Sequence, residues 1–307
     1  MPGKSHVGTL PPLTEEEGAF QDTLRKDVEK LADEIGERNV LYFQKLSAAA
    51  DFIKISFEEA GYEVRQQGYE VSGRTCHNIV VEISGTEQGT EIVVIGSHYD
   101  SVIGSPGAND NASGVAALLG LARAFAGKRM SRTLRFVAFV NEEPPFFRTR
   151  RMGSLAYARR CRERGEKIVA MISLETIGYY SDEAGSQGYP FPIGLFYPST
   201  GNFVAFVGNI SSRRLVREVV ASFRRQVKFP SEGGAFPSIV PGVGWSDQWA
   251  FWRMGYQAIM VTDTALFRYP YYHTAQDTAD KIHYEHLTRV VAGLKLVVAD
   301  LVGLFGK

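Results

Sequence analysis

The sequence predicts a single globular domain of the α/β class, with three layers in which helices cover both faces of a mixed, mostly parallel sheet. Short apolar runs rich in β-branched residues, typical of buried strands, alternate with segments whose apolar residues recur every three or four positions, as on one face of a helix. Three of the runs lead directly into His, Asp or Glu. Ligands bind at the carboxyl ends of strands in open α/β sheets, so we expect a site there.

Length, charge and cysteine content narrow the class of protein. The 307 residues suffice for one large domain, expected over residues 14–307 after a flexible tail of residues 1–13. Lys+Arg and Asp+Glu balance at 34 each, so neither nucleic acid nor a membrane surface is indicated as a partner. Cys76 and Cys161 do not form a disulfide framework; we expect them to pack as small apolar side chains, and a single bridge remains open.

No stretch of the chain has the apolar length of a membrane span, and the amino terminus lacks the apolar core of a signal peptide. We therefore expect the chain as it stands to be cytoplasmic, or else to be exported after removal of a signal. The sequence indicates no oligomeric state.

Two helices are expected before the first strand. Thr14 and Glu17 match a capping box, and apolar residues at spacings of three and four follow over residues 20–35. A second series of this kind covers residues 46–60, and Gly61 stands where a carboxyl-terminal cap belongs. Strands are then expected over residues 64–71 and 78–83. A polar turn separates the second of these from the apolar run at residues 92–95, which indicates a hairpin-like pair.

The run at residues 92–95 leads into His98 and Asp100, and a Gly/Pro/Ser turn then delivers Asp110 at the start of an apolar helix. Side chains two apart on a strand point to the same side, so His98 can bind a metal while Asp100 holds its other ring nitrogen. Taken alone, a buried hydrogen-bonded histidine and a helix-capping Asp110 explain this stretch equally well.

Two later strand candidates also lead into carboxylates. Residues 134–140 are followed by Glu142 and Glu143, and residues 168–174 by Glu175. Buried carboxylates are costly unless they are paired or bind a metal, so acidic groups after three strands favour a cation. The remaining expected elements are helices near residues 153–164, 215–227 and 287–304, strands near residues 203–207 and 258–262, and two Gly/Pro-rich connections, residues 179–202 and 229–244, that form a rim or lid.

With His273 in an aromatic loop, these residues meet the needs of a two-metal site. Such a site takes ligands for each ion, one bridging carboxylate and a separate base near the water. Two adjacent glutamates are suited to this, because one can bind metal while the other accepts a proton.

Five motifs, in this order and spacing, resemble the co-catalytic zinc aminopeptidases of the bacterial leucyl aminopeptidase type, a family that includes relatives of glutamate carboxypeptidase and glutaminyl cyclase. The resemblance runs from about residue 78 to residue 277. Its carriers are G-S-H-Y-D-S at 96–101, G-A-N-D-N-A-S-G at 107–114, N-E-E at 141–143, W-S-D at 245–247 and Y-H-T at 272–274.

The resemblance implies a zinc exopeptidase domain with two zinc ions per chain, and it assigns a role to each motif residue. It implies that His98 and Glu175 bind one zinc, that Glu143 and His273 bind the other, and that Asp110 bridges both. Glu142 is then the general acid/base. By the same resemblance Asp100 orients His98 from behind, and Tyr272 hydrogen-bonds the developing oxyanion.

The sequence departs from the family pattern at two positions. Glu175 stands where many of the aminopeptidases carry Asp, which changes the reach of that ligand. Gln248 follows Ser-Asp where relatives often have His, which we expect to affect substrate binding rather than metal. Asp247 either binds a substrate ammonium or anchors the rim, or it simply caps the following helix. Trp245, together with the tryptophans four and seven positions later, has the spacing of a helix face packed in the core.

We expect hydrolysis of peptide bonds, most simply the removal of amino-terminal residues from peptides. A carboxypeptidase acting on acidic or glutamyl substrates is an alternative, with Arg148, Arg150 and Arg151 as its basic pocket, although such a charge run is more typical of a solvated face. Glutaminyl cyclase with one zinc is a second alternative. A non-enzymatic binding domain on the same fold ranks last, because every ligand and the base are present.

Overall fold

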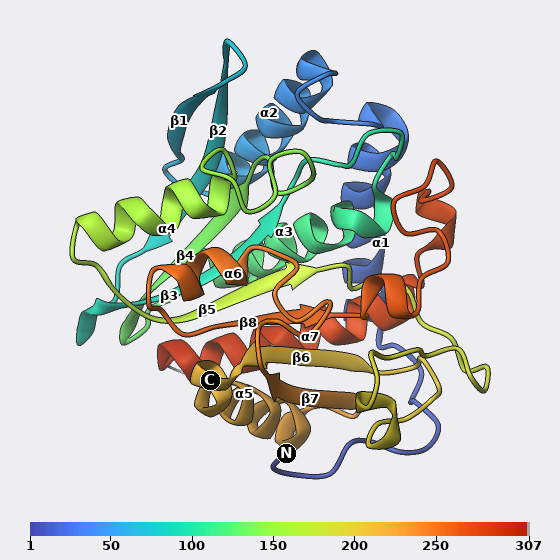
Figure 1. The fold of residues 1–307 in the computed structure, drawn as a ribbon. Helices are drawn as coiled ribbons and strands as arrows, with labels where there is room; N and C mark the ends of the chain where they lie inside the picture. Colours follow the sequence, from blue (N-terminus) through green and yellow to red (C-terminus); the bar gives the residue numbers. More distant parts are fainter. Residues whose placement is uncertain (306–307) are drawn as a thin grey trace.

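The computed structural model describes residues 1–305, which contain one eight-stranded sheet with the order β1-β2-β4-β3-β5-β8-β6-β7 (Figure 1). Four strand pairs are parallel, namely β3 with β4, β3 with β5, β5 with β8, and β6 with β7, and the other three are antiparallel. The predicted mixed, mostly parallel sheet is therefore confirmed. The strands are β1 Arg65–Val71, β2 Arg74–Ile83, β3 Gln88–His98, β4 Arg132–Phe139, β5 Lys167–Glu175, β6 Val204–Asn209, β7 Ser231–Phe236 and β8 Ala258–Thr262.

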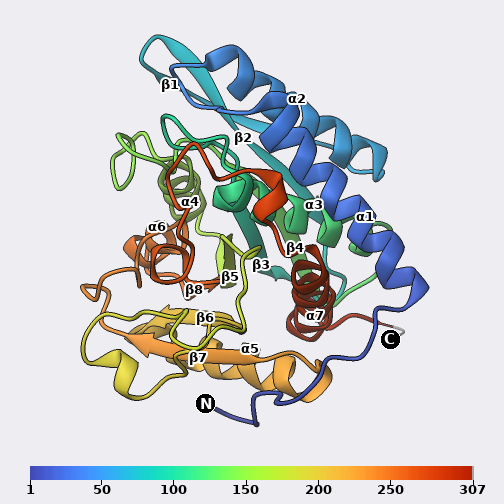
Figure 2. The same cartoon turned by 90° about the vertical axis from the view of Figure 1, so that its right-hand side faces the viewer.

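Helices cover both faces of this sheet, as predicted (Figure 2). The larger core lies on one face and contains the apolar sides of α1, α2, α3, α5 and α7. The smaller core, on the other face, is closed by α4 and α6. The helices are α1 Glu15–Glu29, α2 Phe43–Glu59, α3 Gly114–Phe125, α4 Gly153–Glu163, α5 Arg213–Gln226, α6 Gln248–Arg253 and α7 Tyr284–Val302.

The amino-terminal helices form as the spacing predicts. Thr14 accepts a hydrogen bond from the Glu17 amide, and the Glu17 side chain accepts one from the Thr14 amide, which completes the capping box. A π-helical turn, Lys30–Ile35, continues α1 to Gly36, whose φ of 76° ends the helix. The helix α2 ends at Glu59, and Gly61, with a φ of 91°, follows its capping residue Ala60.

The expected pairing of residues 78–83 with residues 92–95 is wrong. The strand β4 lies between β2 and β3, antiparallel to β2 and parallel to β3, and the hairpin in this region joins β1 to β2. Residues 134–140 are almost entirely apolar, and a strand of that kind is stable where neighbours cover both its edges and both its faces. The short polar connection at residues 84–87 thus passes the end of β4 to reach β3, and does not form a hairpin turn between neighbouring strands.

Two further expectations are corrected. The connection at residues 229–244 contains an edge strand, β7, whose Ser-Glu-Gly-Gly sequence carries no strand signal. Trp245 is 42% exposed and lies before α6, so it is not part of a core helix face. Cys76 and Cys161 are both buried and unpaired, which excludes the bridge that the sequence left open.

Residues 1–14 precede α1 and lie along α5, β7 and α7. Arg224 donates to the Gly3 carbonyl, Ser231 donates its amide to the Ser5 hydroxyl, and Arg289 donates to the Pro11 carbonyl. Flexibility of residues 1–13 stays a prediction. Over residues 1–305, none of the helices combines the length and the apolar content needed to span a membrane.

Candidate active site

Three neighbouring strands deliver the predicted site residues to one edge of the sheet. The strand β3 is central, with β4 and β5 parallel on its two sides. His98 is the last residue of β3, Glu142 and Glu143 follow β4, and Glu175 is the last residue of β5. The carboxyl ends of parallel strands meet at one edge, so the topology alone brings these four side chains together.

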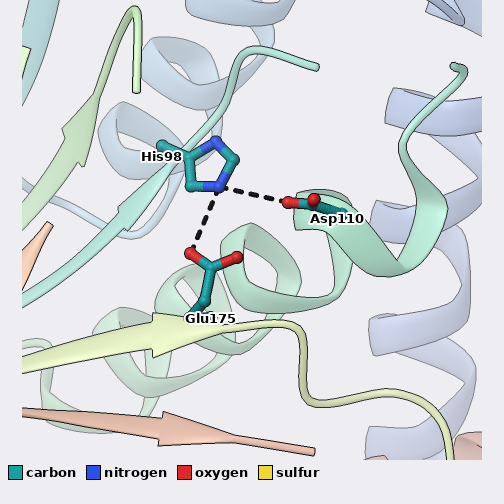
Figure 3. A group of neighbouring side chains, drawn as sticks. All are labelled: His98, Asp110 and Glu175. Atoms are coloured by element: carbon teal, nitrogen blue, oxygen red, sulfur yellow. Dashed lines mark ion pairs between the residues drawn. The ribbon is translucent and has the colours of Figure 1, made fainter. Parts of the chain in front are cut away.

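The first cluster joins His98 to two carboxylates (Figure 3). The His98 Nε2 atom lies 3.2 Å from Oε2 of Glu175 and 3.3 Å from Oδ1 of Asp110. All three residues are buried, and their ligand atoms lie within 4.8 Å of one another. The cluster could offer one nitrogen and two oxygen ligands to a metal ion.

The second cluster shares Asp110 with the first. The His273 Nε2 atom lies 3.0 Å from Oδ2 of Asp110 and 3.2 Å from Oε2 of Glu143, and these three ligand atoms also lie within 4.8 Å of one another. The two carboxylate oxygens of Asp110 thus face different histidines. This is the arrangement expected of a bridging ligand.

Several polar atoms in the two clusters fit a metal. Within residues 1–305, no hydrogen bond satisfies Nε2 of His98, Nε2 of His273, Oδ1 of Asp110 or Oε1 of Glu143, although all are buried. Burial and the nearby Asp110 carboxylate raise the pKa of Glu143 to about 8. Unpaired buried groups of this kind are costly, and a cation satisfies them together. Imidazole nitrogen with carboxylate oxygen is a donor set that zinc accepts.

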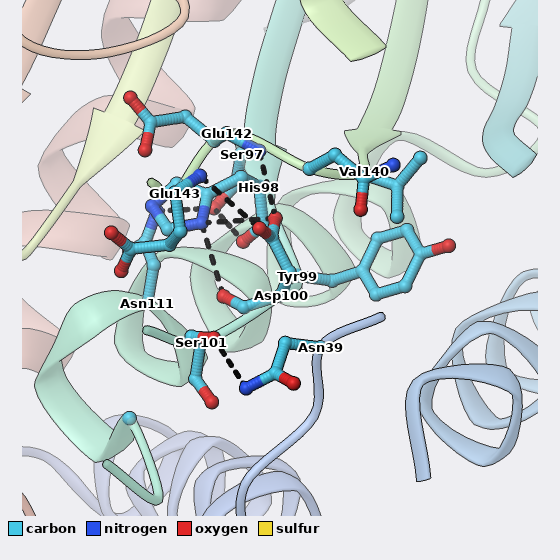
Figure 4. A network of polar contacts seen from close by, with 12 residues as sticks. Asn39, Ser97, His98, Tyr99, Asp100, Ser101, Asn111, Val140, Glu142 and Glu143 are labelled. Atoms are coloured by element: carbon cyan, nitrogen blue, oxygen red, sulfur yellow. Dashed lines mark hydrogen bonds and ion pairs between the residues drawn. The ribbon is translucent and has the colours of Figure 1, made fainter. Parts of the chain in front are cut away.

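Asp100 fixes the backbone of both glutamates (Figure 4). Its Oδ1 accepts from the Glu142 amide at 3.1 Å and its Oδ2 accepts from the Glu143 amide at 3.2 Å. The Nδ1 atom of His98 lies 3.1 Å from the Asp100 carbonyl and 3.5 Å from its carboxylate. Asp100 therefore links the turn after β3 to the turn after β4.

Glu142 has the environment of a proton acceptor. Burial raises the pKa of its carboxyl well above the usual value, and the neighbouring carboxylates of Glu175 and Glu143 add to that rise. A carboxyl group with a raised pKa binds a proton more readily near neutral pH. A general base needs this property, because it must hold the proton that it has taken from water.

Asp277 is a supporting residue to which sequence reasoning assigned no role. Its carboxylate accepts from the amides of Asn109 and Asp110, at 2.8 and 3.1 Å, and the Tyr269 hydroxyl donates to it at 2.7 Å. The loop that bears Asp110 is thereby fastened to the segment that bears His273. The only signal in the sequence was its place at the end of the region of resemblance.

Ser246 and Arg38 also support the site without having been predicted. The Ser246 hydroxyl donates to Oε2 of Glu175 at 2.6 Å. Arg38 is completely buried and donates to the carbonyls of Tyr99 and Gly107, at 2.7 and 2.8 Å. It thus holds both ends of the loop between His98 and Asp110. An isolated arginine between two helices gives no signal of this role in the sequence.

The remaining sequence-predicted residues are placed as follows. Tyr272 stacks on His273, with ring centroids 3.8 Å apart, and lines the cavity described below. Asp247 is fully buried behind the site, does not line that cavity, and makes no capping hydrogen bond to α6. Burial raises its pKa to about 7. Arg148 donates to the Gly244 carbonyl and lies over the Trp249 ring, outside the cavity.

A cavity opens directly beside these two ligand clusters. It encloses about 820 Å³, including its open mouth, and both Glu175 and Tyr272 line it. Most other lining residues are apolar or aromatic and come from β6, β7, β8 and the connections at residues 179–202 and 237–245. Such a cavity suits an organic substrate, with the reacting bond at the metal end.

The chain matches the model of a peptidase family over most of its length. The model of peptidase family M28 matches residues 78–298. The uncharacterized protein YfbL of Escherichia coli (strain K12) is 38% identical over 285 residues, which cover 90% of this chain and 87% of that protein.

Solved structures with the same fold include enzymes of two activities. The zinc aminopeptidase BSAP from Bacillus subtilis has a TM-score of 0.73 at 16% identity, with 92% of this chain and 95% of that chain covered. The glutaminyl cyclase of Fimbriiglobus ruber has a TM-score of 0.66 at 21% identity, with 97% and 98% covered. At these identities the likeness shows the fold alone. The family match together with the YfbL match shows that the chain belongs to peptidase family M28, and the zinc metallopeptidase expected from the sequence is confirmed.

Proposed function

We propose that this M28 peptidase is an aminopeptidase with two zinc ions. In this proposal His98 and Glu175 hold one ion, Glu143 and His273 hold the other, and Asp110 is shared. The proposal rests on the position of the Asp110 carboxylate, which has one oxygen near His98 and the other near His273. When bound, zinc supplies a Lewis acid that lowers the pKa of water and polarises the substrate carbonyl.

Glu142 moves the proton in this mechanism. Its carboxylate accepts a proton from the attacking water and returns it to the amine nitrogen that departs from the broken peptide bond. Asp100 keeps Glu142 and Glu143 in fixed relation, because it binds the amides of both. Tyr272 lines the cavity and stacks on His273, which supports a role for its hydroxyl group as a hydrogen-bond donor to the oxygen of the attacked carbonyl.

Two sister activities are less well supported. A carboxypeptidase needs a cation for the substrate carboxylate, but none of the three arginines after Glu143 lines the cavity. A glutaminyl cyclase with one zinc needs one cluster only, whereas two complete ligand clusters converge on Asp110.

Hydrolysis of amino-acid p-nitroanilides tests the proposal. The zinc-loaded protein should release p-nitroaniline from substrates with a free amino group and not from their amino-blocked counterparts. Chelation should abolish this activity, and added zinc should restore it. The proposal would be overturned if the zinc-loaded protein cleaved no free-amine substrate and instead cyclised amino-terminal glutamine or cleaved acidic dipeptides from the carboxyl end.

Zinc content tests the shared ligand separately from activity. The protein should bind two zinc ions per chain, as measured by elemental analysis after dialysis, and Asp110→Ala should bind fewer than one. An unchanged zinc-to-protein ratio in Asp110→Ala would contradict the bridging role.

A further inference from the structure

A row of four residues crosses the floor of the cavity, away from the metal cluster. The strand registers pair Glu175 with Thr262, Thr262 with Ala205, and Ala205 with Glu232. Residues paired in register point to the same face, and all four line the cavity. Three strand spacings of about 4.8 Å place Glu232 roughly 14 Å from Glu175 along the sheet.

The part of the cavity floor between Glu175 and Glu232 carries only small side chains. Only the small side chains of Thr262 and Ala205 stand between them in the row. In the next row, the Phe236 ring covers Gly234 and forms a wall, since a Cβ atom at Gly234 would lie 2.1 Å from that ring and 3.1 Å from the Tyr197 hydroxyl. The cavity therefore continues as a trough from the metal end to Glu232.

Aromatic side chains form the walls of this trough. Tyr189, Tyr197 and Phe236 line it, with ring centroids 5.9 Å apart for the two tyrosines and 6.2 Å for Tyr197 with Phe236. The Tyr197 hydroxyl donates to the Gly233 carbonyl at 2.9 Å, which ties the wall to β7. Walls of this kind accept the methylene stem of a long side chain, and aromatic faces also attract a cation.

Glu232 is the acidic group at the far end of the trough. Its side chain is 22% exposed, and Arg224 approaches its Oε2 at 3.4 Å. Arg224 also donates to the hydroxyl and the carbonyl of Ser231, so that it is shared among several acceptors. No hydrogen bond to Oε1 of Glu232 occurs within the described part of the chain. Burial raises the pKa of Glu232, while Arg224 opposes the rise.

We propose that Glu232 selects substrates whose amino-terminal residue is lysine or arginine, a specificity that rests on the aminopeptidase function proposed above. The five or six bonds of such a side chain, each about 1.5 Å, reach roughly 6–7 Å from its Cα atom. With the amino-terminal residue held at the metal end, its stem lies over Thr262 and Ala205. Its charged nitrogen then approaches the Glu232 carboxylate. Leucine stops short of that group and leaves the far end of the trough empty.

The test compares lysine with norleucine, which has the same stem without the amine. The kcat/KM for lysine p-nitroanilide should exceed that for norleucine p-nitroanilide in the zinc-loaded wild-type protein. Glu232→Gln should lower this ratio by about tenfold, because it removes the charge and keeps the shape. Glu218→Gln removes a carboxylate from the exposed side of α5, outside the trough, and should leave the ratio as in the wild type. Calorimetric titration with the reaction products lysine and norleucine, which have no bond left to cleave, measures the same preference without turnover.

The outcomes separate this inference from the proposed function. Cleavage of norleucine p-nitroanilide with no preference for lysine, or an equal ratio in wild type and Glu232→Gln, would overturn the role of Glu232 and leave the aminopeptidase standing. Absence of turnover on every free-amine substrate would overturn both. A preference for lysine that is lost in Glu232→Gln, in turnover and in calorimetry alike, is the result expected.

Discussion

The two halves of the sheet differ in how their functional residues are encoded. In the half formed by β2, β4, β3 and β5, four site residues end an apolar strand or follow it within a few positions, in short and recognisable motifs: His98, Glu142, Glu143 and Glu175. In the half formed by β8, β6 and β7, the cavity residues are far apart in the sequence. The pairing register of the three strands brings them side by side. The chemistry of the site is therefore local in the sequence, whereas the shape of its substrate cavity is a product of the tertiary fold.

Replacement of the proposed base should have the largest effect, and it tests the motif-encoded half. Glu142→Gln should lower kcat by about a thousandfold, because the water loses its proton acceptor, while zinc content and thermal unfolding stay as in the wild type. Glu143→Gln is the matched comparison, and it should lower both kcat and the zinc content. Near-normal turnover in Glu142→Gln would contradict the assignment of the base.

Removal of the buried guanidinium should have the next largest effect. Arg38→Met leaves the carbonyls of Tyr99 and Gly107 without donors and should lower the free energy of unfolding by about 3 kcal/mol, measured by urea denaturation. Arg162→Met, at an exposed position of α4, should change it by less than about 0.5 kcal/mol. Equal changes in the two variants would show that Arg38 does not support the loop.

Loss of the hydroxyl behind Glu175 should weaken zinc binding more moderately. Ser246→Ala removes a hydrogen bond of 2.6 Å to this ligand and should lower zinc affinity at one site by about tenfold or somewhat more, measured by competition with a chelator. Ser222→Ala is the control, since Ser222 donates to Asp300 at the same distance, 2.6 Å, on α5. If both variants retain wild-type zinc affinity, the support of Glu175 by Ser246 has no role in metal binding.

The smallest effect is expected in the cavity half. Ala205→Val raises the floor of the trough and should lower kcat/KM for norleucine p-nitroanilide about tenfold relative to alanine p-nitroanilide. The short side chain of alanine does not reach over Ala205. Equal losses on the two substrates would show that the trough does not hold the substrate side chain, and would weaken the contrast between the two halves.

The sequence predicted the fold class and singled out the five residues that the structure brings together in two clusters, whose binding of metal stays a prediction. It did so because His98, Glu143 and Glu175 lie beside strands whose apolar pattern is unambiguous. It missed Arg38 and Asp277, which act through backbone groups far away in the chain. The pairing of β2 with β3 was wrong because sequence proximity favours hairpins, whereas burial of β4 on both sides decides the order. The strand β7 was missed because glycine carries no strand preference.

The clamp between Asp277 and the Asp110 loop bears on how the enzyme is made. The residues proposed to hold zinc extend from His98 to His273, and the carboxylate that fastens the loop follows four positions later. A ribosome adds about 5–20 residues each second, so the growing chain passes many seconds with its first four ligands synthesised and its last one absent. If these residues hold zinc as proposed, the nascent chain lacks a ligand until His273 is made, and we expect peptidase activity to begin only when the carboxyl-terminal third has emerged and docked.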